Sequence, residues 1–193
     1  MKKWTILIII CWLSHITFSQ TIFGIKAGAQ NVYWQGNDVI APYHTYTGYF
    51  AGATANFNIH SHLWAAQAEL LYSAEGIKLD KGDIKITNIS VPLVIQYGPP
   101  PSLYWEGGIQ PNFMVSAKQS GAPTGNGDVK KDFKPFSLQF ITGAGYRFDW
   151  GLGIGVRYNY GLINMAKNKI ENKRNHTISV AILFRFGRPL YQE

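Results

Sequence analysis

The chain has very little cysteine and little charge. Its only cysteine is Cys11, so residues 20–193 hold no thiol, which excludes disulfide bonds, zinc–thiolate sites and a cysteine nucleophile from this part. Charged residues make up 15% of the chain, against roughly 25% in an average soluble domain. The only long wholly apolar run lies at the N-terminus, which leaves no second candidate for a membrane-spanning helix. Aromatic residues are abundant instead, at 15% of the chain, and there are 20 glycines.

The N-terminal run predicts a cleaved signal peptide. The stretch "MKKWTILIIICWLSHITFSQ" has two lysines, an apolar core of ten residues, and Thr17 and Ser19 at the −3 and −1 positions of a signal-peptidase site. The core is shorter than the about 20 residues of a membrane-spanning helix, which argues against a retained anchor. We therefore predict a signal peptide over residues 1–19 and one mature domain over residues 20–193.

Alternation of apolar with small or polar residues predicts an all-β protein. In "GLGIGVRYNYGLIN", Leu, Ile, Val and Tyr alternate with Gly, Arg and Asn, which places the two sets on opposite faces of a strand. A tilted strand crosses a bilayer with about 9–11 residues, and each predicted strand is long enough. The predicted strands cover residues 22–33, 46–58, 63–74, 86–97, 103–117, 136–148, 151–164 and 176–187.

The connections between these strands alternate between short and long. The second, fourth and sixth strands are followed by the short turns "IHSH", "GPPPS" and "DWG". The first, third, fifth and seventh strands are followed by longer stretches such as "QGNDVIAPYHT", "AEGIKLDKGDIK" and "KQSGAPTGNGDVKKDFKP". Short periplasmic turns and longer extracellular loops are typical of an outer-membrane barrel, here an eight-stranded antiparallel up-and-down transmembrane β-barrel. Pro92 and Pro111 lie inside the fourth and fifth predicted strands, where a missing N–H indicates bulges.

The composition of the two faces indicates which one meets lipid. The polar face carries Gly, Ser, Asn and Gln rather than the Lys and Glu of a solvated face, so we predict that it lines the interior. Aromatic residues gather at the strand ends, as in the two girdles of a membrane barrel. The predicted girdle residues are Trp34, Trp64, Tyr72, Tyr97, Trp105, Phe148, Trp150, Tyr160 and Phe186. A soluble barrel with its apolar face turned inward around a ligand is the alternative.

Several stretches resemble a known family. "FGIKAGAQ", "AQAELLYSAEG", "ITNISVPLVIQYG", "LYWEGGIQPNFMVSAK" and "GLGIGVRYNYGLIN" look like the PorT-like outer-membrane β-barrel family. The resemblance covers nearly the whole mature chain, and it implies a small outer-membrane barrel. The member that gave the family its name is associated with a protein secretion apparatus, so the resemblance implies an accessory role in secretion.

The polar face predicts a network of ionisable residues inside the barrel. An eight-stranded barrel is just wide enough for side chains to fill it, which excludes a sugar-conducting porin. We expect the glutamates to pair with the arginines and the glycines to make room for long side chains. A narrow ion or proton path through the same groups is the alternative. The predicted network consists of Lys26, Glu69, Glu106, Arg147, Arg157 and Arg185.

The histidines give no pattern of an enzyme or of a metal site. Acyl-transfer chemistry needs a nucleophile and a base within hydrogen-bond reach. His15 lies in the signal peptide, His60 and His62 lie in a short turn without a third ligand nearby, and His44 and His176 lie near the outer rim. We therefore predict a protein that is not an enzyme, with no catalytic residues, no metal and no cofactor.

The third and fourth long loops are rich in basic residues. They lie where the phosphates of lipopolysaccharide would be, and cationic side chains bind phosphate well. The predicted contacts are Lys130, Lys131, Lys134, Lys167, Lys169, Lys173 and Arg174. A solvated loop without a ligand is the alternative. Export and the absence of a recognition motif exclude nucleic acid as a partner.

Two classes of function stay open at this stage. The first is a non-enzymatic structural or interaction component of the outer membrane, accessory to secretion, whose partners are outer-membrane lipid, lipopolysaccharide and proteins of the envelope or of the secretion apparatus. The second is a small transport (porin-like) barrel or one that modifies lipid A. Conductance in planar bilayers and the state of lipid A distinguish the two classes.

Overall fold

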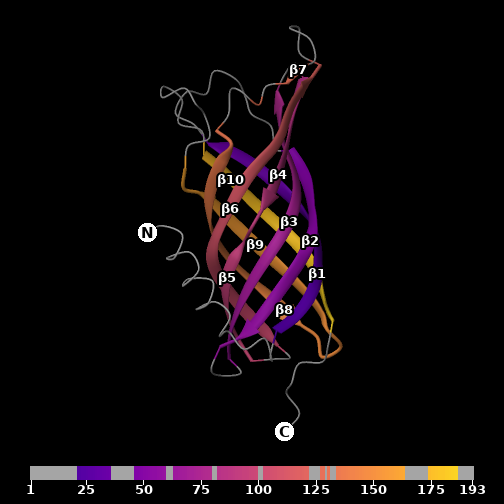
Figure 1. Ribbon diagram of the computed structural model, residues 1–193, viewed down its shortest axis with the longest axis vertical. Helices are drawn as coiled ribbons and strands as arrows, with labels where there is room; N and C mark the ends of the chain where they lie inside the picture. Colours follow the sequence, from indigo (N-terminus) through magenta and orange to yellow (C-terminus); the bar gives the residue numbers. More distant parts are fainter. Residues whose placement is uncertain are drawn as a thin grey trace, which may run out of the picture.

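The strands wind around a single closed barrel (Figure 1). The computed structural model describes residues 21–35, 46–59, 63–79, 82–99, 102–121, 127–128, 130, 134–163 and 174–186. The predicted signal peptide therefore lies outside the described residues. The elements in chain order are β1 (Thr21–Gln35), β2 (Tyr46–Asn58), β3 (Trp64–Leu79), β4 (Gly82–Ser90), β5 (Leu93–Tyr97), β6 (Leu103–Ser120), β7 (Gly127–Asp128), β8 (Phe136–Arg147), β9 (Leu152–Gly161) and β10 (Arg174–Phe186). No helix in this part of the chain is long and apolar enough to cross a membrane.

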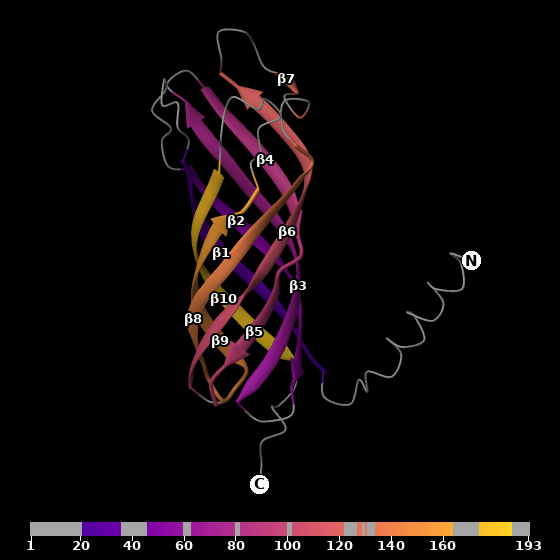
Figure 2. The ribbon, with the colours of Figure 1, turned by 90° about the vertical axis from the view of Figure 1, so that its left-hand side faces the viewer.

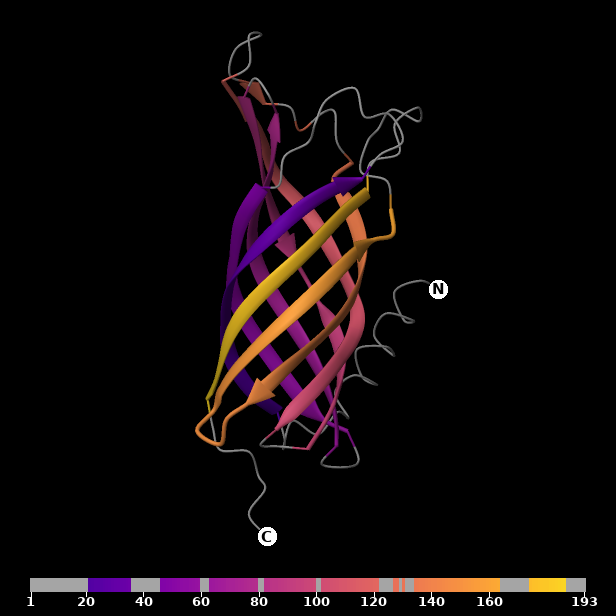
Figure 3. The same cartoon turned by 180° about the vertical axis from the view of Figure 1, so that it is seen from behind.

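Pairing of the first strand with the last closes the wall. β1 pairs with β2 on one side and with β10 on the other, where the register runs from Phe23 opposite Phe186 to Gln35 opposite Arg174. Every pairing is antiparallel, and β4 and β5 together form one stave, so the barrel has eight staves. The predicted fold class is therefore confirmed. The yellow β10 and the indigo β1 lie side by side in Figure 3.

Pro92 interrupts the fourth stave but does not open the wall. The Pro92 carbonyl accepts a hydrogen bond of 2.9 Å from the Glu69 N–H, and the N–H of Val91 donates to the Pro111 carbonyl at 2.9 Å. Pro111 itself stays in register opposite Leu138, so the predicted bulge at Pro111 is wrong. The irregularity lies further along β6, where the register shifts between Thr87 and Asn88 of β4.

The second long connection is mostly strand, which corrects the prediction of a loop over Ala74–Lys85. β3 continues to Leu79 and β4 starts at Gly82, with Leu79 opposite Gly82. This hairpin forms because its inner face has apolar partners: Ile86 packs with Met114 and Ala117 in a buried cluster. β3, β4 and β6 consequently extend beyond the other strands at one end of the barrel (Figure 1).

The two ends of the barrel differ in their connections. At the short-turn end, β8 and β9 are joined by a tight turn in which Gly151 has a φ of 94°, a conformation that favours glycine. The Phe148 N–H donates to the Leu152 carbonyl across this turn at 2.8 Å. β1 begins and β10 ends at this same end, whereas β1 ends and β10 begins at the opposite end, which we call the long-loop end (Figure 2).

The two faces of the wall differ as the alternation predicts. Apolar side chains such as Ile154, Val156, Val180 and Ile182 are exposed on the outside. Polar side chains on the alternate positions are buried inside, and they include glutamine, asparagine, serine and the charged residues described below. Within the stretch Gly151–Asn164, β9 thus turns Ile154, Val156, Tyr158 and Tyr160 outward.

A charge on the outer face should impair the barrel. Val156 is 51% exposed and lies between Val180 and Ala144 on the neighbouring strands. We expect Val156→Arg to cost about 2–4 kcal/mol and to impair insertion, because an arginine near the bilayer midplane is poorly solvated. The measurement is the fraction of heat-modifiable, protease-resistant barrel on unboiled gels. Val156→Thr serves as the control, and wild-type insertion of Val156→Arg would mean that the outer face is assigned wrongly.

Candidate functional site

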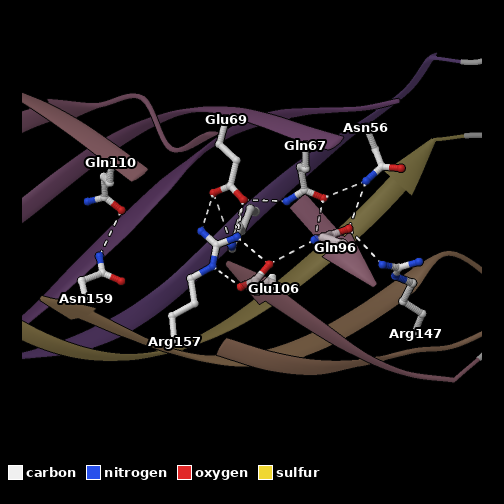
Figure 4. Close-up of polar contacts among 10 residues, drawn as sticks. Asn56, Gln67, Glu69, Gln96, Glu106, Gln110, Arg147, Arg157 and Asn159 are labelled. Atoms are coloured by element: carbon white, nitrogen blue, oxygen red, sulfur yellow. Dashed lines mark hydrogen bonds and ion pairs between the residues drawn. The ribbon is translucent and has the colours of Figure 1, made fainter. Parts of the chain in front are cut away.

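Four charged side chains from four strands meet inside the barrel and form the charge cluster (Figure 4). Arg157 of β9 donates to both oxygens of Glu69 of β3 at 3.0 and 2.6 Å. It also donates to both oxygens of Glu106 of β6, from Nη2 at 3.0 Å and from Nε. Lys26 of β1 adds bonds of 3.1 and 3.2 Å to Glu69. The two cations balance the two carboxylates, and this satisfies groups that would otherwise be costly to bury.

Gly143 of β8 makes room for this cluster. A Cβ atom at Gly143 would lie 2.6 Å from the backbone oxygen of Val156 and 3.1 Å from both Arg157 Cγ and Glu106 Oε1. A larger residue there would clash with the backbone of β9 and crowd the stem of Arg157 and the Glu106 carboxylate. The interior glycines on the polar face of the alternation therefore include at least one that the charge cluster requires.

A belt of amides surrounds the charge cluster on the side of the short-turn end. Gln67 donates to Glu69 at 2.6 Å, and Gln96 donates to Glu106 at 3.1 Å. Asn56 joins the two glutamines with bonds of 3.2 and 3.1 Å (Figure 4). The carboxylates therefore have amide, lysine and arginine partners, an arrangement that holds both as charged acceptors.

Arg147 connects the amide belt to an aromatic ring. Its Nη2 donates to Gln96 Oε1 at 2.9 Å, and its guanidinium carbon lies 4.3 Å from the centre of the Tyr104 ring. Arg147 thus enters the network through Gln96. Arg185 lies half-buried at the short-turn end, on the same face of β10 as Leu183.

Two further polar networks lie toward the long-loop end. In one, Asn159 donates to Gln110 at 3.0 Å and to Gln139 at 3.2 Å, while Gln110 donates to Asn112 at 2.9 Å. In the other, which we call the Glu75 network, Gln30 donates to Ser73 at 2.8 Å, Ser73 to Glu75 at 3.2 Å and Asn175 to Glu75 at 2.9 Å.

Glu75 is an interior carboxyl group that the sequence did not reveal. It lies in "AEGIKLDKGDIK", which reads as a polar loop, but the extension of β3 turns its side chain inward. Continuing the alternation of Gln67, Glu69 and Ser73 by one more step would have found it.

Apolar side chains also occupy the interior, contrary to the expectation of a purely polar inner face. Phe50, Leu71 and Ala181 form a buried cluster, and Ile141 is fully buried. A Cβ atom at Gly28 would lie 2.5 Å from Phe50 Cζ, so the glycine leaves the space that the ring fills. Single apolar residues within a polar series carry no periodic signal, which is why the sequence pattern does not reveal them.

The histidine within the described residues does not form a catalytic set. His176 Nδ1 lies 3.0 Å from the hydroxyl of Tyr158, and its ring packs against Tyr160. His44, His60 and His62 lie outside the described residues. Within the described part of the chain, no group of three His, Cys, Asp or Glu residues is placed to hold a metal ion.

Comparison with known families and structures shows what this barrel is similar to. Residues 18–167 match the model of the outer membrane protein beta-barrel domain family. The chain belongs to this family. Neisserial surface protein A has a TM-score of 0.60 and 16% identity over 85% of this chain and 97% of its own. Ail of Yersinia pestis, in complex with the heparin analogue sucrose octasulfate, has a TM-score of 0.56 and 15% identity over 86% of this chain and 99% of its own. No curated protein sequence matches significantly.

In this outer-membrane barrel the long-loop end corresponds to the extracellular side and the short-turn end to the periplasmic side. Of the aromatic side chains predicted for the girdles, those that the structure describes are exposed on the outer wall. At the periplasmic end the rings of Trp64 and Tyr97 lie 4.7 Å apart, and those of Phe148 and Trp150 lie 5.9 Å apart. Trp105, Phe186, Tyr72 and Tyr160 are exposed as well, and Trp34 belongs to β1.

The basic residues predicted to contact phosphate are only partly described. Lys130 is exposed and donates from Nζ to the Val115 carbonyl at 2.9 Å. Lys134 is half-buried just before β8, and Arg174 is the first residue of β10. The remaining positions lie outside the described residues: Lys131, Lys167, Lys169 and Lys173.

Removing the central cation should destabilise this outer-membrane barrel. Arg157→Met leaves two buried carboxylates with one lysine between them, and we expect a cost of about 3–5 kcal/mol in the free energy of unfolding. The measurement is urea-induced unfolding in lipid vesicles. Asp149→Asn, which removes an exposed charge in the turn between β8 and β9, is the control and should change the free energy by less than about 0.5 kcal/mol. Equal stability of the two variants would contradict a structural role of the charge cluster.

Proposed function

We propose that this outer-membrane barrel is a non-enzymatic structural or interaction component of the outer membrane, with a closed lumen. The observation that carries the proposal is the charge cluster, because Arg157 bridges Glu69 and Glu106 across the lumen with four hydrogen bonds. Opening a path for solutes would require separating buried charges from their partners, which costs several kcal/mol. The interaction surface is then the outer wall and the extracellular end.

An accessory role in protein secretion is the finer form of this proposal. It rests on the resemblance of "AQAELLYSAEG" and "ITNISVPLVIQYG" to PorT-like barrels. The long connections and the extracellular extension of β3, β4 and β6 offer a surface for proteins of the envelope or of the secretion apparatus.

Lipopolysaccharide is the partner that we propose for the basic residues at the extracellular end. Lys130 is exposed beside β6, and the phosphates of lipopolysaccharide lie at this level of an outer-membrane barrel. Ail, a barrel of the same fold, is known in complex with a sulfated sugar, which is a related polyanion. The predicted contacts at Lys131, Lys134, Lys167, Lys169, Lys173 and Arg174 belong to the same proposal.

The closed lumen and the absence of catalysis can be tested together. We expect purified, folded protein to give no stable large single-channel currents in planar bilayers, because side chains fill an eight-stranded barrel. A 16-stranded porin reconstituted in the same way is the positive control. We also expect the mass spectrum of lipid A to stay unchanged when the protein is overexpressed. Stable large currents or newly modified lipid A would overturn the proposed function in favour of transport or of lipid A modification.

A further inference from the structure

The extension of β3, β4 and β6 presents two lysines side by side at the extracellular end. Lys85 of β4 and Lys118 of β6 are register partners, and both are exposed. Like charges directly opposite each other on neighbouring strands repel, and an anion between them offsets this repulsion. On the other side of β6 the register partner of Lys118 is Asp128 of β7. In the sequence, Lys85 lies in the second long connection and Lys118 in the third. Only the extension of β4 and β6 brings the two residues together.

The rest of the extension holds these lysines in a fixed position. Its inner face is anchored by Ile86, Met114 and Ala117, so the sheet is not free to bend inward. Four residues below Lys85 lies Ile89, which pairs with the exposed Phe113 of the outer wall. At the rise of a strand this separation is about 13 Å, which places the ammonium groups at the level of lipid headgroups.

A third cation lies next to this pair. Lys130 donates from Nζ to the Val115 carbonyl, and Val115 precedes Lys118 by three residues on β6. Asp83 is a half-buried acid that lies opposite Ser120. It stands two residues further along β4 from the membrane than Lys85 does. With Asp128 opposite Lys118, the group has three lysines and two acids, so its net charge is positive.

We propose that Lys85, Lys118 and Lys130 form a binding site for a phosphate group of lipopolysaccharide. This proposal rests on the proposed contact of the extracellular end with lipopolysaccharide, and it assigns that contact to one site. Ammonium groups on a rigid sheet surround a phosphate from one side, while the acyl chains of the same molecule cover the exposed wall below Phe113.

The test compares a double variant with a matched control. Folded protein in detergent is titrated with lipopolysaccharide, and again with the same lipopolysaccharide after enzymatic removal of its phosphates. We expect the double variant Lys85→Gln with Lys118→Gln to bind the phosphorylated form at least about fivefold more weakly than wild type, and the dephosphorylated form equally well. Lys85→Arg with Lys118→Arg keeps both charges and should bind like wild type.

The outcomes separate this site from the broader proposal. If the double variant binds phosphorylated lipopolysaccharide like wild type, the assignment to Lys85 and Lys118 is wrong, although the barrel still contacts lipopolysaccharide. If wild type does not bind it at all, both fail. A titration with inorganic phosphate alone identifies the source of the anion: binding at the same concentrations as lipopolysaccharide would overturn the lipid source.

A separate observation concerns a small cavity in the middle of the lumen. It has a volume of about 10 Å³, and it lies between the charge cluster, through Arg157, and the Glu75 network, through Gln30 and Ser73. Ser90 and Asn159 also line it. Ser90 Oγ and Asn159 Oδ1 are both buried and have no hydrogen-bond partner among the described residues. A buried polar atom without a partner costs about 1–3 kcal/mol.

We infer that this cavity binds one water molecule that bridges Ser90 and Asn159. A space of this size holds about one water, and polar lining is what a buried water requires. Phe50 and Leu71 of the buried apolar cluster also line this cavity. The water supplies the hydrogen-bond partner that Ser90 Oγ and Asn159 Oδ1 lack among the described residues.

The water is detectable by NMR of the folded protein in nanodiscs. We expect a cross-peak between a long-lived water and the side-chain amide of Asn159. Ser90→Val fills the cavity and should remove this cross-peak while the backbone spectrum stays that of a barrel. Ser90→Ala keeps the space but removes one of the two groups that the water bridges, so the cross-peak should weaken and not disappear. No cross-peak in wild type, or one that persists unchanged in Ser90→Val, would overturn this inference.

Discussion

Closure of the hydrogen-bond ladder between β1 and β10 is the constraint on which the rest of the structure depends. Within hydrocarbon no water can satisfy a free N–H or C=O group, so a sheet that crosses a membrane must have no edge. The pairing from Phe23–Phe186 to Gln35–Arg174 removes that edge. Even at Pro92, where one donor is missing, the neighbouring carbonyls of Pro92 and Pro111 stay bonded. The wall therefore tolerates two prolines because their carbonyls still have donors.

Closure of eight staves fixes the size of the interior, and the size determines what the interior can hold. The lumen is narrow, so side chains from opposite walls meet, as Arg157 of β9 does with Glu69 of β3. Such buried charges contribute little net stability when paired, but they are costly to separate. The charge cluster thus favours one arrangement of the lumen and opposes a path for solutes. Glycines such as Gly143 contribute by leaving the space that these long side chains need.

Because the interior is closed, a partner can reach only the outer wall and the two ends of the barrel. The outer wall is apolar and belongs to lipid, whereas the extracellular extension of β3, β4 and β6 is a rigid sheet outside the membrane. Its inner face is packed with Ile86, Met114 and Ala117, and its outer face carries Lys85 and Lys118. A strand extension that carries exposed lysines is suited to the contact with lipopolysaccharide that we propose.

The sequence alone determined the eight staves, their faces and the direction of each connection, because a period of two residues reports directly which side chains share a face. Period says nothing about register or about distance between strands. Only the tertiary structure therefore paired Arg157 with Glu69 and Glu106, packed Phe50 against Ala181 in the lumen and set Lys85 beside Lys118. Each of these depends on hydrogen bonding between strands far apart in the chain, and no single strand carries that information.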